Sequence, residues 1–194
     1  MWFQVCITLR FLASGAFYNV IGEAMGVQKA TVCRVLDAVL DCLVNVASKW
    51  IALPISQDQL AEIKVGFYRK RQFPAVIGCV DGTHVAIRTP PRNEDVFVCR
   101  KGFHSINVML INDHKNRITA VSARFPGSAH DMAVFDCSNI QQRMENGDLQ
   151  NKGLLLADSG YALRPYLMTP VLIATSQRPR GQIQCCSQGD KGKH

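Results

Sequence analysis

Three aspartates stand at or beyond the ends of apolar segments that are predicted to be buried strands: Asp81, Asp131 and Asp158. Asp81 and Asp158 are each followed within two residues by a glycine. In a mixed α/β sheet, functional side chains collect where buried strands end, because the rigid backbone delivers them to one edge. The pattern therefore predicts that the three carboxylates converge on one site.

Converging carboxylates repel one another, and their burial is costly unless a cation or hydrogen-bond donors meet them. A divalent metal removes that repulsion, and oxygen ligands suit Mg²⁺ or Mn²⁺. Two such ions about 3.5–4 Å apart form a centre that cleaves phosphodiester bonds without a side-chain nucleophile. The alternative is structural, because an aspartate before a glycine is also common in turns.

Positive charge is concentrated in the middle of the chain. The 194 residues carry a formal net charge of +7, and residues 60–130 hold eleven basic and five acidic side chains. A face that binds a polyanion is therefore expected in this segment. Arg100, Lys101 and His104 precede a predicted strand there and are candidates to contact a phosphate backbone. The alternative for these three is a solvated strand entrance.

Two histidines lie within three residues of an aspartate, namely His84 and His130. Each is a candidate to orient a carboxylate, to bind metal or to relay a proton. A hydrogen-bonded structural role is the alternative for both.

The first fifty residues are predicted to be helical. A short helix over residues 17–25, a glycine turn and a longer amphipathic helix over 28–47 follow the layout of a helix-turn-helix. The longer helix begins with polar residues, among them Lys29 and Arg34, which are candidate DNA contacts. The alternative is an ordinary three-helix bundle.

Beyond the helical start, one more helix is predicted over residues 57–71, and the pattern then changes to strands. Strands are expected over residues 75–80, 84–88, 105–111, 118–123 and 153–157, with a short helix over 130–137. The apolar line of the first two strands is interrupted at residues 81–83. Three strands in hairpin order, a helix and a further apolar strand indicate a mixed α/β sheet.

The composition argues against several classes of protein. The eight cysteines include no CxxC pair, which argues against a disulfide framework and a zinc site. They are expected to be reduced, intracellular thiols that mostly fill the core. The apolar start lacks a basic n-region, which argues against a signal peptide. The sequence contains no apolar run of about 18 residues, so no transmembrane helix is predicted.

Four blocks occur in one order along the chain: GCVDGTH at 78–84, RKGFHSIN at 100–107, PGSAHD at 126–131 and DSGYALRP at 158–165. They resemble the PIF/Harbinger transposase superfamily, and within it the domesticated vertebrate branch of transposase-derived nucleases. The helical start, from Arg10 to Val35, resembles that family's helix-turn-helix region. The resemblance covers roughly residues 3–172.

The resemblance implies a ribonuclease-H-like fold with a DDE-type acidic site that uses Mg²⁺ or Mn²⁺ to hydrolyse DNA. Asp81 matches the first acidic position, Asp158 is the better candidate for the second, and Asp131 is a candidate further ligand. The family's third catalytic group is a Glu in a later Arg-Asn-x-Ile-Glu block, which this sequence lacks; only Asp190 is acidic after Asp158. Without that Glu, we expect poor cleavage or none. The competing hypothesis is a non-catalytic remnant that binds nucleic acid or a protein partner.

The resemblance further implies a separate Myb-like protein as a partner that supplies DNA recognition, and a location in the nucleus and cytoplasm.

Four parts of the chain are expected: a helix-turn-helix-like region at 1–50, a connecting helix at 51–73, an incomplete nuclease domain at 74–172 and a divergent, disordered tail at 173–194.

Overall fold

The structure, a computed structural model, describes residues 2–170. The expected tail at 173–194 lies outside these residues. The chain divides into two compact units, a helical unit that ends at Ala52 and a sheet unit that begins at Leu53. Each unit is described by itself.

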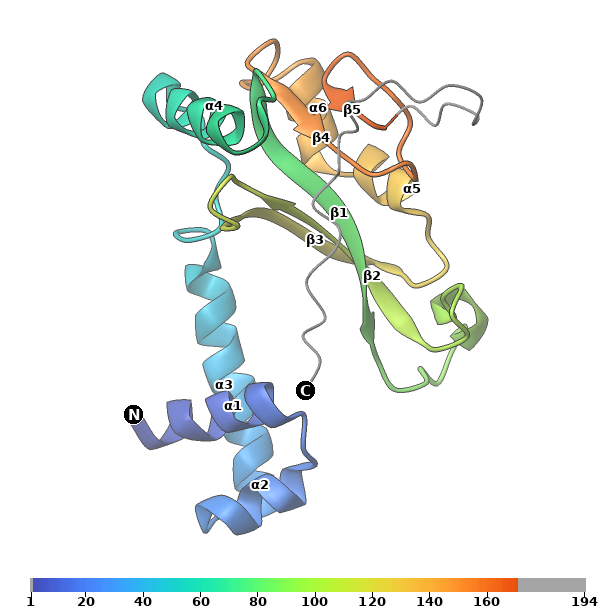
Figure 1. Cartoon of the computed structure of the whole chain (residues 1–194). Helices are drawn as coiled ribbons and strands as arrows, with labels where there is room; N and C mark the ends of the chain where they lie inside the picture. The colour runs from blue at the N-terminus through green and yellow to red at the C-terminus, as the bar shows by residue number, and fades with distance from the viewer. Residues whose placement is uncertain (1, 171–194) are drawn as a thin grey trace, which may run out of the picture. The chain divides into compact units, whose positions relative to one another are not determined.

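The helical unit consists of three helices: α1 (Trp2–Ser14), α2 (Tyr18–Met25) and α3 (Lys29–Ala47) (Figure 1). The helices predicted over 17–25 and 28–47 are confirmed to within one residue. Gly26 makes the turn between them with a φ of 68°, a left-handed conformation that a residue without Cβ adopts readily. One buried cluster joins the three helices: Ile7, Ile21, Val32, Val35 and Leu36.

The sheet unit is a mixed α/β structure, as the sequence predicted. Its elements are α4 (Gln57–Arg71), β1 (Val76–Ala86), the 3-10 helix η1 (Glu94–Phe97), β2 (Ser105–Asn112), β3 (Ile118–Pro126), α5 (Asp131–Asp136), α6 (Asn139–Glu145), β4 (Leu154–Leu156) and β5 (Leu167–Met168). The strand order is β3-β2-β1-β4-β5. The first three strands pair antiparallel, whereas β4 pairs parallel with both β1 and β5. The sequence did not predict η1, α6 or β5.

Strand β1 runs without interruption through the Asp-Gly-Thr sequence that starts at Asp81. The predicted interruption at residues 81–83 is therefore wrong, and Asp81 lies inside a strand rather than at its end. These residues stay extended because each pairs with a residue of β2, as Asp81 does with Leu110. Cross-strand pairing thus outweighs the turn preference of Asp-Gly.

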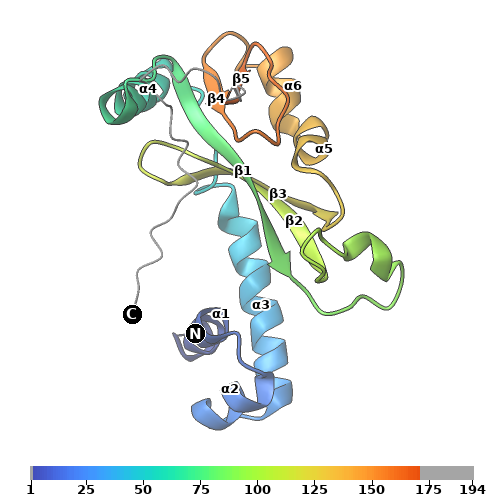
Figure 2. The ribbon, with the colours of Figure 1, turned by 45° about the vertical axis from the view of Figure 1, so that its right-hand side comes forward.

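Two hydrophobic clusters pack on the sheet, largely on opposite faces, and α4 contributes Leu60 to the main cluster and Ile63 and Phe67 to the smaller one. Neighbouring residues of a strand point to opposite faces, and Leu155 belongs to the main cluster whereas Leu156 belongs to the smaller one. The main cluster includes Phe135 of α5, and the smaller one includes Phe67 of α4. Figure 2 shows α4 on one side of β1, and α5 and α6 on the other. Phe67 is buried and therefore serves as a packing residue.

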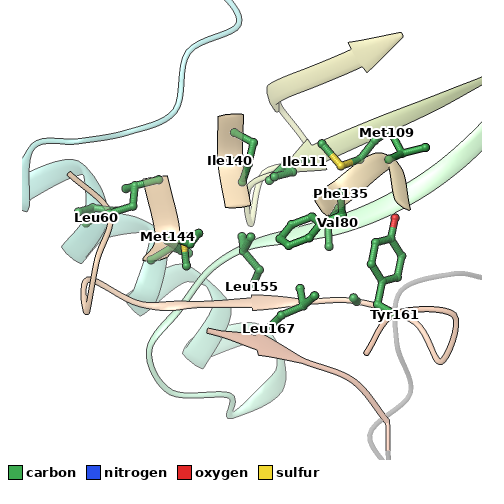
Figure 3. Packing of buried hydrophobic residues seen from close by; sticks show 14 residues of the cluster. Leu60, Val80, Met109, Ile111, Phe135, Ile140, Met144, Leu155, Tyr161 and Leu167 are labelled. Atoms are coloured by element: carbon green, nitrogen blue, oxygen red, sulfur yellow. The ribbon is translucent and has the colours of Figure 1, made fainter. Parts of the chain in front are cut away.

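The main cluster is the largest buried core of the unit and contains Leu60, Ile77, Val80, Met109, Ile111, Val134, Phe135, Ile140, Met144, Leu149, Leu155, Ala157, Tyr161 and Leu167. Figure 3 shows how side chains from helices and strands interlock there. The core fixes α5 and the segment after β4 against the same face of the sheet.

The loop between β2 and β3 is organised by the buried carboxylate of Asp113. It accepts hydrogen bonds from the backbone N–H groups of Lys115 and Arg117 at 2.8 and 2.9 Å, and from Arg117 Nε at 2.8 Å. Burial alone would raise the pKa of Asp113, but these donors and the Arg117 charge outweigh it and hold the pKa below its ordinary value. The same loop packs on α4, where the His114 ring lies against Gly66.

The cysteines of the described residues do not mostly fill the core, which corrects that expectation. Within residues 2–170 none of them is joined in a disulfide: Cys99 is buried, Cys33 and Cys79 are half-buried, and Cys6, Cys42 and Cys137 are exposed. A thiol is small enough to be tolerated at the surface, so apolar neighbours in the sequence do not predict whether a cysteine is buried. None of the helices between residues 2 and 170 has the length and hydrophobicity of a membrane span.

Candidate functional site

Asp81 and Asp158 occupy corresponding positions on neighbouring parallel segments. Cys79 of β1 pairs with Leu156 of β4, and each aspartate comes two residues later in its own segment. Because side chains alternate with a period of two, Asp81 shares the face of Cys79. Asp158 lies just past β4, where the chain leaves the sheet. The register therefore gives the two aspartates equivalent positions near the end of β4, close enough for the charge of Asp158 to act on Asp81.

Asp131 approaches β1 from the opposite face. It is the first residue of α5, and a Cβ atom at position 82 would lie 2.2 Å from its Oδ1 atom. Gly82 directly follows Asp81 in the strand, so a side chain at position 82 would point away from that of Asp81. The missing Cβ of Gly82 is what permits this close approach. The backbone of β1 thus runs between Asp131 and the side chain of Asp81.

The carboxylate of Asp131 is held by a buried asparagine. Asn107 of β2 donates from Nδ2 to Asp131 Oδ1 at 2.8 Å and to the carbonyl oxygen of Ala129 at 2.9 Å. Asn107 itself is 1% exposed. The sequence reasoning did not single out this residue, although it closes the block at 100–107 that carries the family resemblance.

The charges of the three aspartates act on one another. Asp81 is exposed, and partial removal of its carboxyl from water raises its pKa. Repulsion by Asp158 and Asp131 raises this pKa further, whereas the backbone N–H of Gly82, which donates to Oδ1 at 2.8 Å, lowers it. The net direction is upward from the ordinary aspartate value. The charges of Asp158 and Asp131 therefore act on Asp81, and the convergence of the three carboxylates on one metal site stays a prediction.

Tyr161 lies beside this acidic group. Burial, followed by the charges of Asp131, Asp81 and Asp158, raises the pKa of its phenol above the ordinary value. Its hydroxyl is buried and has no hydrogen-bond partner among the described residues. Figure 3 shows the ring at the rim of the main cluster, with the hydroxyl directed away from Leu167. In the sequence, Tyr161 is marked only by its place in the block at 158–165.

A second missed residue, Arg164, ties the segment after β4 to the helices. Its Nη2 atom lies 2.6 Å from Asp136 Oδ1 at the end of α5, and its Nη1 atom lies 3.0 Å from the hydroxyl of Tyr166. Tyr166 in turn donates to Glu145 of α6 at 2.6 Å. This network connects the segment that carries Asp158 with the helix that begins at Asp131. Its only sequence signal was membership in the block at 158–165.

The donor chemistry of the acidic group suits a hard divalent cation, because carboxylate oxygens are the ligands that Mg²⁺ and Mn²⁺ prefer. Within residues 2–170, no ion pair includes Asp81, Asp131 or Asp158, so no cationic side chain offsets their repulsion in this way. The geometry is not that of a finished site, since no three His, Cys, Asp or Glu side chains of the described part are grouped to hold a metal ion.

The two candidate histidines lie in different settings. His84 is half-buried on β1, and its Nδ1 atom lies 3.1 Å from the hydroxyl of the buried Ser105. His130 is exposed and directly precedes α5. His84 therefore has a structural partner, whereas His130 is open to solvent next to Asp131.

The candidate nucleic-acid contacts are distributed over both units. Arg100 and Lys101 are exposed in a tight turn after η1, which Gly102 closes with a φ of 81°. His104 is half-buried, and its Nδ1 atom lies 3.3 Å from the hydroxyl of Thr89, which makes it a poorer phosphate contact than its neighbours. In the helical unit, the two candidates of α3, Lys29 and Arg34, are both exposed.

Comparison with known proteins identifies the class. The family model of DDE superfamily endonucleases matches residues 80–190, and the chain belongs to this family. The match begins at the strand that carries Asp81 and covers the whole acidic group.

The curated relatives agree with the resemblance seen in the sequence, and several of them carry the name of a putative nuclease. The chain is 36% identical to "Putative nuclease HARBI1" of Homo sapiens over 170 residues, which is 88% of this chain and 48% of that protein. It is 34% identical over 173 residues to the protein of the same name from Xenopus laevis, covering 89% of this chain and 50% of that protein. "Protein ALP1-like" of Arabidopsis thaliana is 29% identical over 182 residues, covering 86% and 44%. The chain spans about half the length of these curated relatives, and no solved structure matches it.

Proposed function

We propose that this chain carries a metal-dependent nuclease site that acts on phosphodiester bonds of DNA. In this proposal Asp81 and Asp158 hold the divalent metal, and Asp131 supports them from the other face of β1. The observation that carries the proposal is the register of β1 and β4, which gives both aspartates the same offset from the pair formed by Cys79 and Leu156. Membership in the DDE superfamily endonucleases supports it independently.

The fold proposed for the nuclease domain, at residues 74–172, is ribonuclease-H-like. The strand order β3-β2-β1-β4-β5, with three antiparallel strands followed by two parallel ones, supports this fold. The division between units after Ala52 supports a separate helix-turn-helix-like region at 1–50, with the connecting helix at 51–73.

The three aspartates would have different roles in this site. Asp81 and Asp158 would bind the cation at the point where β4 ends, while the adjacent N–H groups of Gly82 and Gly160 orient their carboxylates at 2.8 and 2.9 Å. The chemistry that a bound Mg²⁺ or Mn²⁺ supplies is activation of the attacking water and stabilisation of the leaving oxygen. Asp131 would add negative charge behind the pair and strengthen cation binding.

DNA binding is proposed for the exposed basic residues of both units. Arg100 and Lys101 would contact the phosphate backbone near the sheet, and Lys29 and Arg34 would contact DNA from the helical unit. His104 is a weaker member of this proposed set. A Myb-like partner and a nuclear and cytoplasmic location remain proposals that rest on the family resemblance alone.

The second candidate function is a non-catalytic remnant that binds nucleic acid or a protein partner. One observation favours it: among the described residues, no three His, Cys, Asp or Glu side chains are grouped to hold a metal ion.

A plasmid-nicking experiment separates the two functions. Purified protein is incubated with supercoiled DNA and Mn²⁺, beside Asp81→Ala, Asp158→Ala and the control Asp95→Ala, which removes an exposed carboxylate of η1. The nuclease proposal expects nicking by the wild type and by Asp95→Ala, and at least a hundredfold loss in the two site variants. DNA binding without nicking in any protein would favour the remnant.

A further inference from the structure

We propose that Asn107 is a positioning residue of the acidic site, whose buried side-chain amide fixes Asp131 at the start of α5 behind Asp81. The inference rests on the proposed metal-dependent function. It concerns a residue that touches neither substrate nor metal and acts through Asp131.

The contacts of Asn107 account for both hydrogens of its amide nitrogen. One N–H donates to Asp131 Oδ1 at 2.8 Å and the other to the carbonyl oxygen of Ala129 at 2.9 Å. The first contact fixes a carboxylate, and the second fixes the backbone two residues before it. Asn107 therefore holds the place where the chain enters α5.

An asparagine is the side chain that this position requires. Serine would supply one donor instead of two, whereas alanine or leucine would supply none. Aspartate would set a second carboxylate against Asp131. The amide oxygen of Asn107 is buried without a partner among the described residues, so the two donor contacts alone fix the orientation of the amide.

Gly82 limits the position of the Asp131 carboxylate from the side opposite Asn107. A Cβ at position 82 would come within 2.2 Å of Asp131 Oδ1, the same atom that Asn107 holds. Gly82 pairs with Met109, which lies two residues from Asn107 on β2. Gly82 and Asn107 therefore both lie on the face of the main cluster. The carboxylate is thus held between a buried amide and a bare strand backbone.

The position in which Asp131 is held determines how strongly its negative charge acts on Asp81. With its Oδ1 held between Asn107 and the bare backbone of Gly82, the Asp131 carboxylate keeps its negative charge directly behind Asp81. Without Asn107, the Asp131 side chain is free to rotate into solvent, where water screens its charge. Groups outside the ligands of a metal site, as proposed here for Asp131, typically contribute 10–100-fold to metal affinity, and Asn107 acts through Asp131. We therefore expect Asn107→Ala to weaken Mn²⁺ binding about tenfold.

The first measurement is Mn²⁺ binding by titration calorimetry in the absence of DNA, on the full chain. Asn107→Ala is compared with Asn112→Ala, which removes a half-buried asparagine of the same strand whose two side-chain hydrogen bonds are both 3.5 Å long. The expected result is a tenfold higher Kd for Asn107→Ala and an unchanged Kd for Asn112→Ala. Asn107→Ser keeps one donor, is expected to fall between, and carries the test if Asn107→Ala does not fold.

The second measurement is a double-mutant cycle in metal-free buffer, with Asn107→Ser, Asp131→Ala and both together, followed by urea unfolding. The positioning role expects the two effects to be coupled, because the residues share a hydrogen bond. Additive effects, or a Kd for Mn²⁺ in the Asn107 variants equal to that of the wild type, would overturn the role of Asn107 alone. A wild-type chain that binds no Mn²⁺ would overturn the proposed function and this role with it.

Discussion

The helical unit and the sheet unit are built from contacts of different range. The helical core joins three consecutive helices, and its buried residues run from Ile7 to Leu36. In the sheet unit, Val76 pairs with Leu154, and Leu60 shares a cluster with Leu167. Contacts near in sequence shape the first unit, whereas contacts distant in sequence shape the second.

The acidic site occurs where the distant contacts are made. Asp81, Asp131 and Asp158 come from three segments, and only the pairing of β1 with β4 and the packing of α5 set them near one another. The helical unit carries exposed basic residues but no comparable group. The comparison teaches that the candidate chemistry depends on the register of the sheet, so substitutions that disturb the sheet should matter most.

The largest effect is expected from Phe135→Ala in the main cluster. Phe135 is fully buried, and its truncation leaves a cavity that costs about 3–5 kcal/mol of unfolding free energy. Peptide-resolved hydrogen exchange is expected to show faster exchange in the sheet unit and unchanged protection in α1–α3. The control Phe3→Ala removes a half-exposed ring and is expected to change stability by less than about 1 kcal/mol. Equal loss of protection in both units would contradict their independence.

The reciprocal test is Leu36→Ala in the helical unit. Leu36 is 2% exposed on α3, and the truncation is expected to cost about 2–5 kcal/mol, toward the lower end because the cluster is small. Urea unfolding and hydrogen exchange would locate the loss in α1–α3. Leu43→Ala on the same helix, where Leu43 is 48% exposed, is the matched control and is expected to have little effect. A loss of similar size from Leu43→Ala would argue against the assigned core.

A smaller effect on stability, but a direct one on the site, is expected from Gly82→Ala. The new Cβ would clash with Asp131 Oδ1, so the carboxylate or the strand must shift at a cost of about 1–3 kcal/mol. Mn²⁺ binding should weaken in parallel. Thr83→Ala, at the next and exposed position of β1, is expected to leave both measurements unchanged. Unchanged Mn²⁺ binding by Gly82→Ala would contradict a contribution of Asp131 to metal binding by Asp81 and Asp158.

The smallest effect is expected from Asp113→Asn in the β2–β3 loop. The folded pKa of Asp113 lies below its unfolded value near 3.8, so the carboxylate contributes stability that is present above that value and is lost as the pH falls through the folded pKa. The variant should therefore be less stable at neutral pH and lose less stability on acidification. Urea unfolding between pH 3 and 7 measures this, with the exposed Asp95→Asn as control. An identical pH profile for Asp113→Asn and wild type would exclude a role for this carboxylate in acid unfolding.

Much of the fold could be read from local patterns. Apolar spacing predicted the helix over 57–71 and the helices of the first unit, because helical hydrogen bonds join residues four apart. Alternating and apolar runs predicted β2, β3 and β4. The short α6 and β5 escaped detection because neither segment has the length to show a periodicity, and β5 exists only through its pairing with β4.

The sequence proposed the acidic residues of the candidate site but not the arrangement in which the structure holds them. The sequence alone determined that three aspartates, carried in blocks of a known family, follow or enter apolar segments. Only the tertiary structure decided that Asp81 lies inside a continuous strand, that Asp131 reaches β1 from the opposite face over Gly82, and that Asn107 holds it there. The physical reason is that a residue's type sets its chemistry, whereas strand register, which joins residues far apart in the chain, sets the face on which that chemistry appears.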